Sequence, residues 1–184
     1  PDSVYFPFTV GNYWIYDIYY VNDTTGLEEK KNFGDTVRII AEEMINGNNY
    51  YVVEQKEEWL SSGNLKDTIY LRDSSGYLVN LAGVIIFSYE DFNNTLHAID
   101  YSPATWAVEF SVSDTTENLT VPAGTFECLN YKGRVYSTNP NITVPDRFWH
   151  NCYAEDVGLI FETTFFSGQY DSHFERRLSE YHLE

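Results

Sequence analysis

The sequence predicts an all-β domain, formed by a single antiparallel and strongly curved sheet that approaches a barrel and contains little helix. Three observations support this fold class. Apolar and polar residues alternate with a period of two over much of the chain, which is typical of half-buried strands. Aromatic residues make up 17% of the composition, with 16 Tyr and 12 Phe, and such residues suit a pleated surface. Gly- and Asn-containing clusters divide the runs at spacings of roughly a dozen residues, as a meander requires.

The expected strands are runs rich in β-branched and aromatic residues. The clearest lie at 13–20, 36–41, 66–72, 105–112, 126–136 and 147–153. The first is aromatic on both faces for part of its length, as expected in the middle of a curved sheet. The expected turns are Asn46–Asn49, Ser61–Asn64 and Asp73–Gly76, where Gly and Asn permit the positive φ of tight hairpins. Pro122 and Gly124 predict a further tight turn that leads into the strand 126–136.

Helix is nearly absent from the pattern. The best candidates are Tyr89–Leu96 and a short turn near Pro103 and Ala104, although neither has a convincing cap with a sustained 3.6-residue period. About ten strands without a domain boundary must protect their sheet edges, and closure toward a barrel does so. A sandwich of two sheets is the alternative. We expect one domain over residues 1–182, and we interpret Leu183-Glu184 as a possible cloning scar.

Charge and hydropathy restrict the partners. The 184 residues contain 11 Lys+Arg and 28 Asp+Glu, so the formal charge is −17, which disfavours binding to a nucleic-acid backbone. The longest apolar run, Leu81–Phe87, has seven residues, whereas about 20 are needed to span a bilayer. No signal segment precedes Pro1, so we expect any export signal or N-terminal membrane anchor to have been removed.

Three segments resemble a pattern of uncharacterised exported proteins and lipoproteins of bacteria. They are Phe6–Tyr16 (FPFTVGNYWIY), Val121–Cys128 (VPAGTFEC) and Tyr153–Ile160 (YAEDVGLI). The resemblance implies a curved, incompletely closed antiparallel barrel similar to the periplasmic LolA/LolB-like carriers of lipoproteins, with lipocalins as a further comparison. It implies an exported location, periplasmic or at the cell surface, but no agreed activity. This chain has Glu155-Asp156 where the pattern favours Pro-Gly.

Cys128 and Cys152 are the most specific pair of reactive residues. Two cysteines in an exported domain favour a disulfide, whereas two buried, reduced thiols are the alternative. If the strands 126–136 and 147–153 form a hairpin centred on Pro140, pairs of residue numbers sum to 280 and Cys128 faces Cys152. The four histidines have no metal signature. His150 with Cys152, and Asp171 with His173, share a strand face at i, i+2, and three such ligands could hold zinc. Strands place half of all residues at this spacing, so structural or solvent-exposed histidines are the favoured interpretation.

Motifs of nucleotide binding and of serine hydrolases are absent from the sequence, so we expect no enzyme activity, no cofactor and no metal. The first hypothesis is an exported binding module that holds a lipid or another hydrophobic small molecule in its concave face, lined by Trp14, Tyr16, Trp106 and Phe126. The second is a structural or interaction domain of a cell-surface assembly, whose concavity is filled by its own side chains. The sequence identifies no protein partner.

Overall fold

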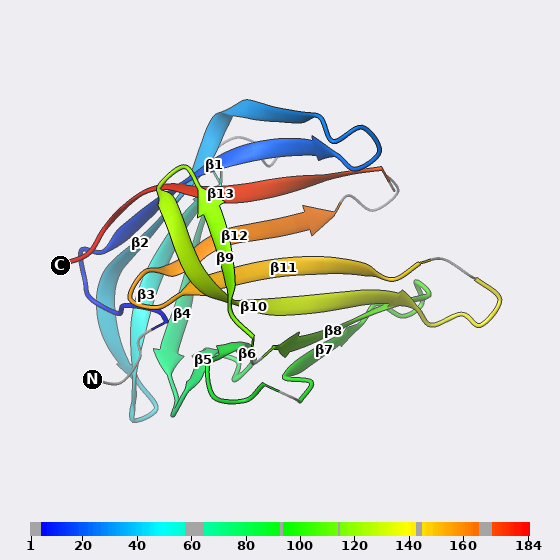
Figure 1. The fold of residues 1–184 in the computed structure, drawn as a ribbon. Coiled ribbons are helices and arrows are strands. Elements are labelled where there is room, and N and C mark those ends of the chain that lie inside the picture. Colours follow the sequence, from blue (N-terminus) through cyan, green and yellow to red (C-terminus); the bar gives the residue numbers. More distant parts are fainter. Residues whose placement is uncertain (1–4, 58–64, 93, 114, 143–144, 166–170) are drawn as a thin grey trace.

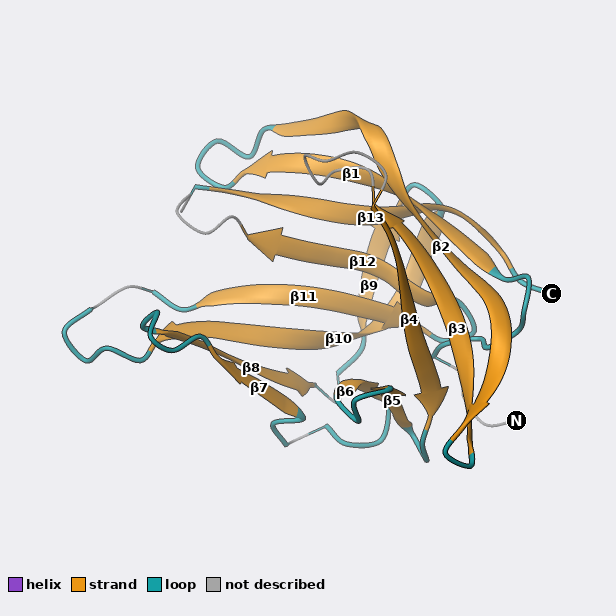
Figure 2. Cartoon of the chain, turned by 180° about the vertical axis from the view of Figure 1, so that it is seen from behind, coloured by secondary structure: helices purple, strands orange, loops and turns teal. Residues whose placement is uncertain are grey.

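A computed structural model of the chain describes residues 5–57, 65–92, 94–113, 115–142, 145–165 and 171–184 (Figure 1). Within these ranges the chain forms thirteen strands and no helix, and Figure 2 shows only strands and loops. The strands are β1 (Tyr13–Asn22), β2 (Glu28–Ile45), β3 (Asn48–Glu57), β4 (Leu65–Asp73), β5 (Tyr77–Asn80), β6 (Ile85–Ser88), β7 (His97–Asp100), β8 (Trp106–Val112), β9 (Glu117–Val121), β10 (Gly124–Ser137), β11 (Arg147–Ala154), β12 (Gly158–Phe165) and β13 (Ser172–His182). The predicted all-β class is therefore confirmed.

All strands belong to one antiparallel sheet, so the predicted curved sheet is found and the sandwich alternative is wrong. The order is β6-β5-β4-β3-β2-β1-β13-β12-β11-β10-β8-β7, and β9 pairs with β10 beside this path. β1 lies in the middle of the path, as its aromatic residues predicted. The sheet curls until it is nearly closed, and its two ends are the short strands β6 and β7 (Figure 1).

The hairpin turns explain why the strands follow one another as neighbours. Asn46 and Gly47 join β2 to β3 with φ values of 50° and 80°, which is the two-residue turn that matches the strand twist. Ser75 and Gly76 have φ values of 54° and 84° in the turn between β4 and β5. Both turns were predicted; the expected turn Ser61–Asn64 lies outside the described residues.

The concave face of the sheet is filled by aromatic side chains. The Phe87 ring from β6 stacks on Tyr153 from β11 with centroids 4.2 Å apart, although these strands are distant in the sheet order. The Tyr131 hydroxyl on β10 donates to the Ile85 carbonyl at 3.1 Å, which joins the two sides of the sheet again. Irregular register in β1, at Ile15/Tyr16, increases the local bend. The core therefore lies inside the curl of the sheet.

Two details of the sequence interpretation need correction or comment. Tyr89–Leu96 is not a helix; its described residues are bends and irregular chain that follow β6. Leu183 packs against the core, and the Glu184 amide donates to Asn12 at 2.8 Å, so the two residues set aside as a cloning scar take part in the packing. The turn expected near Pro103 is present.

Candidate functional site

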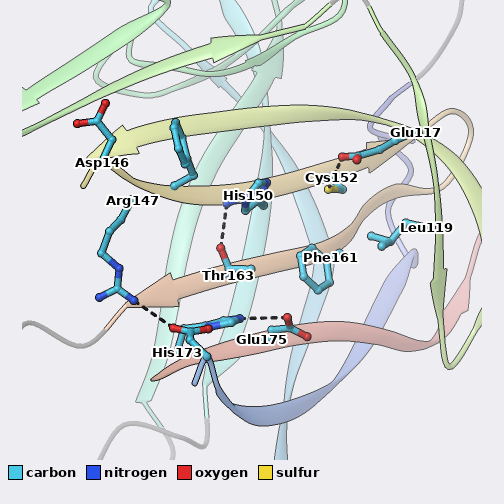
Figure 3. Close-up of a pocket in the computed structure, with 12 residues that line it drawn as sticks. Glu117, Leu119, Asp146, Arg147, His150, Cys152, Phe161, Thr163, His173 and Glu175 are labelled. Atoms are coloured by element: carbon cyan, nitrogen blue, oxygen red, sulfur yellow. Dashed lines mark hydrogen bonds and ion pairs between the residues drawn. The ribbon is translucent and has the colours of Figure 1, made fainter. Parts of the chain in front are cut away.

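A groove of about 540 Å³ lies on the outer face of the sheet, between β9 and the strands β11, β12 and β13 (Figure 3). On β11 the odd-numbered Tyr153 points into the core, where it meets Phe87. Side chains alternate between faces along a strand, so His150 and Cys152 point to the opposite face and line the groove. Thr163 on β12 and Glu175 on β13 join the lining because they are paired in register.

The β9–β10 hairpin covers one end of this groove. In Figure 1, β9 crosses the strands that follow β10, and its turn reaches β13. The Ala123 amide donates to the Leu178 carbonyl of β13 at 3.0 Å, which fixes the turn there. Gly124, with a φ of 147°, begins β10 directly after the turn, so the predicted Pro122–Gly124 turn is present. β9 places Glu117 and Leu119 over the groove.

A network of charges forms the open end of the groove. His173 Nδ1 lies 2.7 Å from Asp23 Oδ1, and His173 Nε2 lies 3.1 Å from Glu175 Oε1. The bond with Glu175 is the main cause that raises the pKa of His173, and burial opposes it. Burial would raise the pKa of Glu175, but the hydrogen bonds from His173 and Arg177 lower it overall. Arg147 Nη2 donates to the second Asp23 oxygen at 3.3 Å, so this end is held by ion pairs.

The covered end of the groove contains mainly uncharged polar groups. Asn130 Nδ2 lies 2.9 Å from Glu117 Oε1 and 2.8 Å from His150 Nδ1, so this amide orients both side chains. The His150 backbone amide donates to Thr163 Oγ1 at 2.9 Å. Burial, together with the nearby Lys132 charge, lowers the pKa of His150, which keeps the ring neutral near pH 7.

The predicted register of the β10–β11 hairpin is wrong by two residues. Cys128 faces Ala154 and Cys152 faces Asn130, so the paired numbers sum to 282 rather than 280. The loop between Ser137 and Arg147 is too long to fix the register as a two-residue turn would. The cysteines are diagonal neighbours on one face and are free, buried thiols in the structure. The disulfide stays a prediction.

The four expected ligand-lining residues do not gather at one surface. Trp14 and Tyr16 are 1% and 2% exposed within the core. Their polar atoms are bonded, because Trp14 Nε1 donates to the Val157 carbonyl at 2.7 Å and the Tyr16 hydroxyl donates to the Leu159 carbonyl at 2.8 Å.

The other two expected lining residues lie elsewhere. Trp106 is half-buried at the start of β8. Phe126 lines a separate surface groove, together with Tyr5, Glu127 and Glu155. The four residues expected to line one ligand site therefore lie in different environments: two in the core, one at the start of β8 and one in a separate surface groove.

The sequence indicated several residues of the outer groove, but it did not predict that they lie together. The i, i+2 pair His150 and Cys152 lies in it, and so does His173, while the Asp171 carbonyl accepts a hydrogen bond from the Asp23 amide beside it. Asp23 and Glu175 were missed. Glu175 shares an i, i+2 spacing with His173 on β13, whereas Asp23 lies in the turn after β1, and no local spacing relates it to the other groove residues.

Comparisons with known proteins agree on the fold. The chain matches no protein-family model and no curated protein. It is similar to the crystal structure of a candidate lipoprotein from Parabacteroides distasonis, with a TM-score of 0.56 and 15% identity over 98% of this chain and 99% of that one. It is also similar to a candidate exported protein with a YmcC-like fold from Bacteroides fragilis, with a TM-score of 0.54 and 15% identity over 98% and 100% of the chains.

These similarities confirm, at the level of the fold, the predicted resemblance to bacterial exported proteins and lipoproteins with a nearly closed barrel. Both matched chains align over almost their whole length, so the fold is shared from end to end. Within the described ranges, no helix is long and apolar enough to cross a membrane.

Proposed function

We propose that this protein is a non-enzymatic interaction domain that works outside the cytoplasm, in the periplasm or at the cell surface. Its interior is filled, and its contact surface is the outer groove beneath the β9–β10 hairpin. The fold shared with an exported protein and a lipoprotein supports the location.

The filled interior carries this proposal. Trp14, Tyr16, Tyr131 and Tyr153 are at most 5% exposed, and the Phe87 ring from β6 stacks on Tyr153. A side chain that lines a ligand cavity keeps an apolar face accessible. Burial of this extent, with the polar atoms of the first three bonded to backbone carbonyls, favours core packing over a lipid-binding cavity.

The groove supports a contact with a cationic partner segment. Four carboxylates line it, from Asp23, Glu117, Asp146 and Glu175, and Leu119, Phe148 and Phe161 add apolar surface. Asp23 is paired with Arg147 and His173, Glu175 with His173 and Arg177, and Asp146 with Arg134. Glu117 is the groove carboxylate that has no cationic partner among the described residues. Together with the charge of −17, this arrangement favours a positively charged chain with an apolar side chain, because complementary potentials steer such partners.

The filled interior is tested with apolar probes. Protein purified under native conditions is expected to carry no lipid in native mass spectrometry and to leave a fluorescent fatty-acid probe unbound. Co-purified lipid, or probe binding that excess lipid displaces, would reject the filled interior and support the lipid-binding hypothesis instead.

The groove is tested with a fluorescent peptide that contains lysines and one tryptophan. Asp146→Asn and Phe148→Ala are expected to weaken its binding, and added salt should weaken it in the wild type. Glu43→Gln is the matched control, since it removes one exposed charge from β2, outside the groove. If Glu43→Gln weakened peptide binding equally, the binding would depend only on the net charge of the protein, and the proposed role of the groove would be rejected.

A further inference from the structure

Glu117, Cys128 and Cys152 form a cluster where β9 pairs with β10, at the covered end of the groove. Figure 3 shows two of the three, Glu117 and Cys152. One potential ligand atom from each residue lies within 4.8 Å of the other two. Cys152 Sγ is 3.7 Å from Glu117 Oε1, and Cys128 Sγ is 3.4 Å from the Glu117 backbone oxygen. Both cysteines are buried, so these three groups are held together by the fold.

We propose that Glu117, Cys128 and Cys152 bind a thiophilic divalent cation of the zinc class. This inference goes beyond the interaction role proposed above and does not depend on it. The sequence shows no zinc signature here, because the two cysteines are 24 residues apart (152 − 128) and the carboxylate comes from a third strand.

The distance between Cys152 Sγ and the Glu117 carboxylate suits a tetrahedral ion. With Zn–S of about 2.3 Å and Zn–O of about 2.1 Å, tetrahedral angles place two sulfurs about 3.8 Å apart and a sulfur and an oxygen about 3.6 Å apart. The observed 3.7 Å between Cys152 Sγ and Glu117 Oε1 matches the second value. Three protein ligands leave the fourth position to water or to a molecule in the groove.

Electrostatics also favour a cation at this position. Two thiolates and the Glu117 carboxylate lie within 4.8 Å of one another here, and like charges this close repel one another in a site that is partly buried. A divalent cation offsets that repulsion and releases protons as it binds.

The surroundings supply the orientation that a metal ligand needs. Asn130 Nδ2 donates to Glu117 Oε1 at 2.9 Å and so fixes the carboxylate. The Asn130 carbonyl oxygen, Oδ1, is buried and has no hydrogen-bond partner among the described residues. Glu117 is exposed and lines the groove together with Cys152, which opens the cluster to ions from solvent.

The test uses the full chain, purified without reductant, and begins with a count of thiols after denaturation in the presence of a chelator. Two reactive thiols are expected. The folded protein is then titrated with Cd²⁺, which should give a thiolate-to-cadmium charge-transfer band that saturates at one equivalent. Zn²⁺ should abolish this band by competition, and the Cd²⁺ affinity should fall as the pH is lowered, because the thiolates must lose protons.

Matched variants separate this site from general binding to an acidic surface. Cys152→Ser should abolish the band. Glu117→Gln should weaken cadmium binding by more than the roughly tenfold effect of losing a ligand's hydrogen-bonding partner. Glu127→Gln, a change of the same charge next to Cys128 but outside the cluster, should weaken the affinity much less than Glu117→Gln.

Three results would overturn the proposal. The first is the absence of free thiols, which would establish the disulfide instead. The second is cadmium binding without the charge-transfer band. The third is equal weakening by Glu117→Gln and Glu127→Gln. None of these results bears on the groove as a contact surface, because that role is tested separately with the peptide.

Discussion

Replacement of Trp14 by alanine tests whether the concave face is core. Trp14 is 1% exposed, packs on Phe6 with ring centroids 5.4 Å apart, and donates its indole N–H to Val157. Loss of a buried tryptophan side chain costs about 3–5 kcal/mol. The unpaired Val157 carbonyl adds about 1 kcal/mol or more. We therefore expect the free energy of unfolding to fall by about 4–6 kcal/mol, a large share of the stability of an ordinary domain.

The assay is urea denaturation followed by far-ultraviolet circular dichroism, since this signal does not depend on the removed indole. Trp106→Ala is the matched control, because Trp106 is half-buried and lies outside the packed core; its expected cost is about 1 kcal/mol. Trp14→Phe keeps a ring but loses the hydrogen bond, so its loss in free energy of unfolding should lie between those of the two alanine variants. This variant can still be measured if Trp14→Ala does not fold. Equal costs for Trp14→Ala and Trp106→Ala would refute the assignment of Trp14 to the core.

Three further predictions concern charge and packing. The raised pKa of His173 means that its ion pairs with Asp23 and Glu175 stabilise the fold fully below the unfolded pKa of about 6.5 and are lost as the pH rises through the folded value. The stability advantage of the wild type over His173→Asn should therefore shrink between about pH 6 and pH 9, and an advantage that grows would contradict the network. A Cβ at Gly133 would lie 2.6 Å from the Phe110 ring, so Gly133→Ala should cost about 1–3 kcal/mol in urea denaturation, and a neutral effect would show that the ring moves freely. Because 28 acidic residues face 11 basic ones, moderate NaCl should raise the melting temperature in calorimetry, whereas a flat or falling response would show that the carboxylates are locally paired.

The fold could be predicted because its determinants are local. Alternation marks the strands, and pairs such as Asn46-Gly47 dictate tight turns that place successive strands side by side. The β10–β11 register could not be predicted, because the long loop after Ser137 permits several pairings. The crossing of β9 over the outer face depends on a contact between Ala123 and Leu178, which are distant in the sequence.

The candidate site was harder to predict than the fold for the same reason. Alternation indicates that Trp14 and Tyr16 face one side of the sheet, but it does not indicate what packs against them. Whether an inward aromatic residue fills space or lines a cavity depends on its partners outside its own strand, here Phe6 and the backbone of Val157 and Leu159. His150 with Cys152, and His173 with Asp171, had a local signal near the groove, because the members of each pair are spaced i, i+2.

The core and the groove are two faces of the same strand, and this links stability to the site. On β11, Tyr153 enters the core while Cys152 enters the groove. Because side chains alternate with a period of two, a slip of one residue would move Cys152 inward and Tyr153 outward. The stacking of Tyr153 on Phe87 therefore selects the register that brings Cys152 beside Glu117. The aromatic excess that suggested a ligand cavity instead holds the outer face in the arrangement from which both proposed sites are built.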